Sequence, residues 1–122
     1  MAKTEESKLE KEVENFMKKH RVWQLARYQA ASNQNGIPDR LYLYKGLLLG
    51  LELKTDKGVP SDLQLRKLKA INDNGGIGLI ITNVKTLDLL LKAIDAYDEL
   101  FDDKASLVKR YLVDLEMEYE NR

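Results

Sequence analysis

Apolar residues follow a helical period near the start of the chain and a strand-like pattern further on. Leu9, Val13 and Phe16 are separated by three or four residues, a spacing that places them on one helical face. Short apolar or β-branched runs bounded by turn residues predict strands. The whole pattern predicts helices over about residues 5–20, 61–74, 84–100 and 104–119, and strands over 22–28, 40–44, 47–54 and 77–82.

The order of these elements, α-β-β-β-α-β-α-α, predicts an α/β domain around one mixed sheet. The dipeptide Lys45-Gly46 separates two of the strands and predicts a tight hairpin, with Gly46 at positive φ. Ser61 is the predicted N-cap of the second helix. The 122 residues fit a single domain, with a core over about 5–83 and a helical extension over about 84–122.

The hairpin brings two carboxylates together. If Lys45 and Gly46 form the turn, Asp39 lies directly opposite Glu52, with Cβ atoms about 4.5–5.5 Å apart. Lys54 lies two residues further, on the same face of the sheet. Two like charges in this position favour a divalent cation between them, and oxygen ligands in a chain without cysteine favour Mg²⁺ or Mn²⁺ over zinc. Exposed strand positions would explain any one of the three residues alone, but not all three within so apolar a run.

Composition and charge narrow the class of protein. The hydrophobic share of 43% and the charged share of 33% are typical of a globular chain, and no apolar run approaches the ~20 residues of a membrane span. With no signal-peptide core at its start, the chain is expected to be cytoplasmic. Residues 18–69 carry 11 Lys and Arg against 4 Asp and Glu, whereas residues 95–122 carry 4 against 9. This distribution is compatible with a phosphate-binding face, and ordinary surface variation explains it equally well.

The motifs resemble those of a known nuclease family. Pro38-Asp39, a gap of twelve residues and Glu52-Leu53-Lys54 resemble the signature of the PD-(D/E)XK nuclease superfamily. Their context resembles the VRR-NUC (virus-type replication-repair nuclease) branch in its stand-alone phage or bacterial form, through the segments NGIPDR (35–40), LELK (51–54), SDLQ (61–64) and GG (75–76). The resemblance covers about residues 6–82. It implies a single nuclease domain with a restriction-endonuclease-like core, similar to Holliday-junction resolvases.

That resemblance implies a metal-dependent endodeoxyribonuclease acting on branched or flapped DNA in a bacterial or phage-infected cell. Asp39 and Glu52 would bind Mg²⁺ or Mn²⁺ with the backbone carbonyl of Leu53, and Lys54 would orient the attacking water. Gln64 matches the glutamine that the family places near the scissile phosphate. Ser61-x-x-Gln64 is also a capping box, so helix capping is an equally good explanation of Gln64.

The family also supplies a glutamate from the first helix, for which Glu6 and Glu10 both qualify. Glu6 falls about 35° and Glu10 about 75° from the centre of the apolar stripe, at 100° per residue. Glu6 is the favoured metal ligand, because a carboxylate within an apolar stripe is the more unusual of the two. Favourable interaction with the helix dipole would explain either glutamate without a catalytic role.

Other residues are assigned by type and position. The expected phosphate contacts, each also explicable as a solvated surface charge, are Arg21, Arg27, Arg40, Lys57, Arg66, Lys67 and Lys69. Trp23, Tyr28, Tyr42 and Tyr44 lie on predicted strands, where we expect them to pack rather than to stack on unpaired bases. The apolar residues after Val84 are expected either to form a homodimer interface or to cover the sheet. A DNA-binding subunit without cleavage activity and a sequence-specific restriction-type endonuclease remain alternatives.

Overall fold

The structure is a computed structural model that describes residues 5–27, 36–55 and 58–100. Its elements are α1 (Glu5–Lys19), β1 (Trp23–Arg27), β2 (Arg40–Tyr44), β3 (Leu47–Leu53), α2 (Asp62–Asp73), β4 (Ile77–Ile81) and α3 (Val84–Leu100). The prediction of an α/β domain with one mixed sheet is confirmed. The helix predicted over 104–119 lies outside the described residues.

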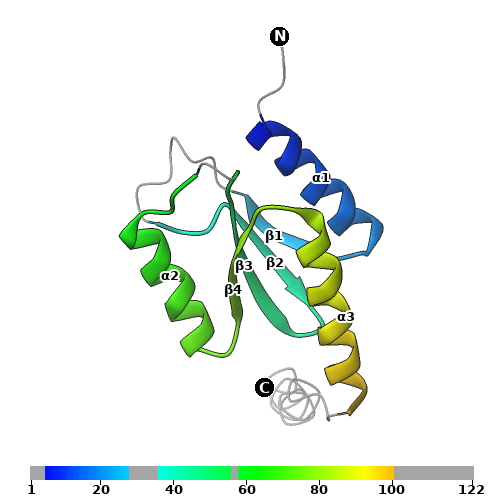
Figure 1. The fold of residues 1–122 in the computed structure, drawn as a ribbon. Coiled ribbons are helices and arrows are strands. Elements are labelled where there is room, and N and C mark those ends of the chain that lie inside the picture. Colours follow the sequence, from blue (N-terminus) through cyan, green and yellow to red (C-terminus); the bar gives the residue numbers. More distant parts are fainter. Residues whose placement is uncertain (1–4, 28–35, 56–57, 101–122) are drawn as a thin grey trace, which may run out of the picture.

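The four strands lie in the order β1-β2-β3-β4. The pairs β1–β2 and β2–β3 are antiparallel, whereas β3 and β4 are parallel and are connected through α2. A parallel pair requires such a crossover, because the chain must return to the same end of the sheet. The sheet lies between α2 on one face and α1 with α3 on the other, which gives three layers (Figure 1). None of these three described helices has the length and apolar character that crossing a membrane requires.

The β2–β3 hairpin has the predicted register. Both turn residues, Lys45 (φ 49°) and Gly46 (φ 82°), lie in the left-handed region. A two-residue hairpin turn requires this conformation in order to match the right-handed twist of its strands. Arg40 pairs with Leu51, so the next position outward places Asp39 opposite Glu52. The register therefore brings the two carboxylates to the same end of the hairpin.

The core fills the space between the sheet and the layer formed by α1 and α3. On β3, Leu49, Leu51 and Leu53 alternate with residues on the α2 face and are fully buried. The helices contribute buried residues at helical spacing: Leu9, Val13 and Met17 from α1, and Leu87, Leu91 and Ile94 from α3. These α3 residues therefore cover the sheet, whereas Leu89 and Tyr97 of the same helix are exposed. The proposed dimer interface stays a prediction.

Two paired glycines allow α2 to lie close to the sheet. Gly50 on β3 pairs with Gly78 on β4. A Cβ atom on Gly50 would lie 2.5 Å from Cδ1 of Ile71, and one on Gly78 would lie 2.6 Å from the carbonyl oxygen of Leu68. At Gly78 the neighbour is backbone, so only glycine fits, whereas at Gly50 the Ile71 side chain would have to shift. The close approach holds the N-terminus of α2 beside the end of β3, where Glu52 lies.

The prediction for the strand aromatics holds for two of the three that the structure describes, while Tyr28 lies outside the described residues. Tyr42 is buried, and Tyr44 is half-buried and donates a hydrogen bond of 2.6 Å from its hydroxyl to Oδ1 of Asp95 on α3. For Trp23 the prediction is wrong, because 62% of this residue is exposed. Trp23 lies on β1, an edge strand. Helix α2 packs on β3 and β4 and does not extend over β1.

Candidate functional site

Two buried carboxylates form the centre of the candidate site. Asp39 precedes β2 and is 5% exposed, while Glu52 near the end of β3 is completely buried. The backbone N–H of Leu53 donates a hydrogen bond of 3.1 Å to Oδ2 of Asp39. The other oxygens, Oδ1 of Asp39 and Oε2 of Glu52, are buried without a hydrogen-bond partner. Buried carboxylate oxygens normally have partners, so these two atoms point to a missing proton or cation.

The surroundings of Glu52 favour its protonated form. Burial, chiefly, and the neighbouring Asp39 carboxyl raise the pKa of Glu52 to about 8. The Lys54 ammonium opposes this shift, but it is the weaker influence. A carboxyl group with so high a pKa retains a proton near neutral pH unless a cation replaces it.

Lys54 and Gln64 reach the same oxygen of Glu52 from two directions. The Nζ atom of Lys54 lies 3.9 Å from Oε1 of Glu52. The Nε2 group of Gln64, in the first turn of α2, donates a hydrogen bond of 2.8 Å to that oxygen. The structure therefore brings together Asp39, Glu52, Lys54 and Gln64, four of the five residues predicted to be catalytic.

Gln64 caps α2 and also contacts Glu52, while its catalytic role stays a prediction. Its Oε1 accepts a hydrogen bond of 2.8 Å from the backbone N–H of Ser61, and its backbone N–H donates to Oγ of Ser61 at 3.1 Å. These two bonds form the capping box, while the amide group of the same side chain contacts Glu52. The helix cap thus fixes the side chain that orients Glu52.

The two candidate glutamates of α1 do not join this cluster. Glu6 is exposed. Glu10 forms an ion pair of 3.8 Å with the guanidinium of Arg40. Within the described ranges, no group of three or more His, Cys, Asp or Glu side chains is arranged to hold a metal ion. Among the described residues, Asp39 and Glu52 are the two carboxylates brought together here. The metal-binding roles of Glu6, Glu10 and the Leu53 carbonyl stay predictions.

The structure contradicts the phosphate-contact role predicted for Arg40. Its side chain is 1% exposed, so it cannot reach DNA on the surface. It forms an ion pair of 3.1 Å with Glu14 of α1 and donates a hydrogen bond of 3.1 Å to the carbonyl oxygen of Asp39. Arg40 points to the face opposite Asp39, because adjacent strand residues alternate. This alternation is a signal in the sequence that places Arg40 on the face opposite Asp39, whereas its pairing with Glu14 depends on how α1 packs.

The other predicted phosphate contacts differ in their surroundings. Arg27 is exposed and forms an ion pair of 3.2 Å with Glu14. Lys69 forms an ion pair of 2.6 Å with Asp73, one helical turn away. Lys57 lies outside the described residues. The remaining contacts are exposed and stay predictions: Arg21, Arg66 and Lys67.

Comparison with known proteins does not assign the chain to a family. No protein-family model, no curated protein and no solved structure matches the chain. The residues of the site are therefore the basis on which a function can be proposed.

Proposed function

We propose that this chain is a divalent-metal-dependent endodeoxyribonuclease with a restriction-endonuclease-like core of the VRR-NUC type. The observation that carries the proposal is the buried Asp39–Glu52 pair, whose oxygens Oδ1 and Oε2 have no hydrogen-bond partner. Lys54 borders this pair and completes the residue types that the PD-(D/E)XK signature requires, and Gln64 contacts Glu52 from α2.

The donor set suits Mg²⁺ or Mn²⁺. Mg²⁺ is usually held by one or two carboxylates and keeps several water molecules or phosphate oxygens as further ligands. Asp39 and Glu52 supply two carboxylates, each with one oxygen already fixed by a donor from the protein. The second oxygen of each is left for the cation. When bound, the metal would supply a polarised phosphate and a water molecule of lowered pKa.

The reaction is hydrolysis of a phosphodiester. The oxygen of water forms a new bond to phosphorus, the bond to one bridging oxygen breaks, and that leaving oxygen takes up a proton. Lys54 would hold the attacking water or stabilise the negative charge that develops on the phosphate. Gln64 and the N–H of Leu53 would keep the two carboxylates in a fixed orientation, so that little reorganisation is needed during the reaction.

The proposed substrate is branched DNA, such as a four-way junction or a flap. Recognition of shape suits a small domain, because reading a base sequence in the major groove requires elements that enter the groove. Exposed cations on α2, including Arg66 and Lys67, would contact the phosphate backbone. A homodimer would place two such sites on one branched substrate.

A cleavage assay tests the proposal. Labelled four-way junction, flap, single-stranded and linear duplex DNA are incubated with Mg²⁺, Mn²⁺ or EDTA. We expect metal-dependent cleavage that falls at least 100-fold in Asp39→Asn and Lys54→Met, since each change removes a charge that acts on the reacting phosphate. Asp95→Asn is the matched control, because Asp95 lies on α3 and contacts Tyr44 and Lys45 instead.

Each alternative has a distinct outcome. DNA binding without cleavage under any metal would replace the nuclease by a binding subunit. Cleavage of duplex DNA at one sequence only would identify a restriction-type enzyme. Undiminished cleavage in Asp39→Asn would refute the assigned site.

A further inference from the structure

Helix α2 covers only half of its face of the sheet. It packs on β3 and β4, where Leu68 and Ile71 lie against Gly78 and Gly50. The half formed by β1 and β2 exposes 62% of Trp23 and 39% of Leu43. An exposed indole next to further apolar side chains is typical of a binding surface.

This exposed surface lies on the same face as the candidate active site. Trp23 pairs with Leu43, and Leu43 pairs with Leu48, so the three side chains form a row across the sheet. Leu48 and Glu52 are four residues apart on β3 and therefore share a face. At ~3.3 Å per residue along a strand and ~4.8 Å between strands, Trp23 lies roughly 16 Å from Glu52.

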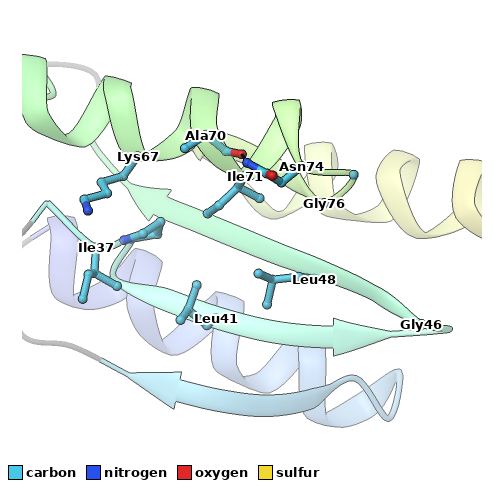
Figure 2. A pocket seen from close by; sticks show the side chains of 11 residues that line it. Ile37, Leu41, Gly46, Leu48, Lys67, Ala70, Ile71, Asn74 and Gly76 are labelled. Carbon is cyan, nitrogen blue, oxygen red and sulfur yellow. Dashed lines mark hydrogen bonds between the residues drawn. The ribbon is translucent and has the colours of Figure 1, made fainter.

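An apolar cavity of about 520 Å³ lies between the row and α2. Leu41 and Leu48 belong to its lining, together with Pro38, the residue directly before Asp39. Figure 2 shows Leu41 and Leu48 from the hairpin facing Ile71 from α2. Lys67 adds a cation to this lining. The cavity does not include the carboxylates, but it joins the Trp23 row to the segment that carries Asp39.

The chemistry of this surface suits an unpaired nucleotide. An indole face stacks on any base, because every base has a π-face. The strands β1, β2 and β3 contain a single acidic residue, Glu52 itself, so no carboxylate on them repels a phosphate near Trp23. At the ~3.4 Å spacing of a duplex strand, the distance to Glu52 corresponds to about five nucleotides, and to fewer in an extended single strand.

We infer that Trp23 stacks on an unpaired base of the DNA substrate a few nucleotides from the scissile phosphate. The surface formed by Trp23, Leu43 and the cavity beside Leu48 would then select DNA that has unpaired nucleotides next to the cut. This inference rests on the proposed function, because the distance from Trp23 to Glu52 is relevant only if Glu52 lies at the scissile phosphate.

The fluorescence of Trp23 provides the test, because it is the only tryptophan in the chain. The full chain is titrated in EDTA, which prevents metal-dependent cleavage, with a single-stranded thymidine oligomer. An oligomer of equal length with abasic positions and a linear duplex serve as matched ligands. We expect strong quenching by the thymidine oligomer and little by the other two. Equal quenching by the abasic oligomer would overturn the inference, since its phosphates are the same.

Variants separate aromatic stacking from apolar contact. Trp23→Leu retains an apolar side chain, and we expect it to weaken binding of single-stranded and flap DNA by roughly 5- to 100-fold, measured by anisotropy of labelled DNA. Trp23→Phe should retain most of the affinity. Leu89→Ala, at an exposed residue of α3, is the control and should leave the affinity unchanged. Unaltered affinity in Trp23→Leu would refute the stacking role.

The failures of the two proposals are distinguishable. Metal-dependent cleavage without base-dependent quenching would overturn the inference and leave the nuclease intact. Base-dependent quenching without cleavage would support the Trp23 site on a DNA-binding protein and refute the nuclease. Sedimentation without DNA provides a further check. Self-association that disappears in Trp23→Leu would identify a protein interface in place of the nucleotide site.

Discussion

At the residue scale, Gln64 contacts two partners with its two amide atoms. Its oxygen completes the cap of α2 through Ser61, and its nitrogen donates to Glu52. A glutamate at this position would still accept from Ser61, since Glu is a common residue of capping boxes. The same change would replace the donor to Glu52 by a further carboxylate.

We therefore predict different effects for substitutions of the two capping-box residues, Gln64 and Ser61. Gln64→Glu should reduce kcat for DNA cleavage at least tenfold, because the donor to Glu52 is lost although the capping box survives. Ser61→Ala should lower the free energy of unfolding by about 1 kcal/mol and leave kcat nearly unchanged. Steady-state cleavage kinetics and urea unfolding measure both. A loss of kcat in Ser61→Ala equal to that in Gln64→Glu would show that capping alone explains Gln64.

At the element scale, Arg40 joins α1 to the start of β2. The guanidinium pairs with Glu14 on the helix and donates to the backbone of Asp39. A buried cation of this kind fixes the distance between helix and strand, because its partners are the groups that compensate its loss of hydration. The position of Asp39 thus depends on a contact made on the opposite face of the sheet.

Arg40→Met should lower the free energy of unfolding by about 2–4 kcal/mol, since Glu14 and the Asp39 carbonyl lose a buried donor. Arg40→Lys should recover only part of this loss, because an ammonium cannot reproduce the planar fork of the guanidinium. Urea unfolding measures the change, and Arg66→Met on exposed α2 is the control, expected within about 0.5 kcal/mol of wild type. If Arg40→Met is as stable as wild type and instead binds DNA with a reduced salt dependence, Arg40 is a phosphate contact after all.

At the scale of the whole molecule, the proton on Glu52 couples the site to the stability of the fold. Burial and the neighbouring Asp39 raise the pKa of Glu52 in the folded chain to about 8, from a reference value of 4.5. Between these values the folded state binds more protons than the unfolded state. The free energy of unfolding therefore falls as the pH rises through this range, and the contribution of Glu52 is lost above about pH 8.

In EDTA, the stabilisation that protonated Glu52 gives to the Tm should therefore decrease from pH 5 to pH 8. Mg²⁺ should raise the Tm more at pH 8.5 than at pH 6, because it must displace the proton to bind. Glu52→Gln should flatten the pH dependence, raise the Tm in EDTA at pH 8.5 and abolish the effect of Mg²⁺. A Mg²⁺ effect that persists in Glu52→Gln would exclude Glu52 as a metal ligand.

Much of the fold could be predicted from local patterns. The period of Leu9, Val13 and Phe16 predicts α1, and the Lys45-Gly46 turn fixes the register of β2 and β3 because strand pairing is determined once the turn residues are known. That register also predicts the encounter of Asp39 with Glu52. These features depend on residues close in sequence, so the sequence by itself determines them.

The tertiary structure decided what depends on packing between distant elements. The burial of Arg40 requires Glu14 of α1 to lie across the sheet from Asp39, and the exposure of Trp23 follows from α2 packing only on β3 and β4. Gly50 and Gly78 determine the place of α2, because they allow the helix backbone to approach those two strands closely. A sequence shows which residues prefer burial, but which surface each helix covers is determined only when all the layers pack together.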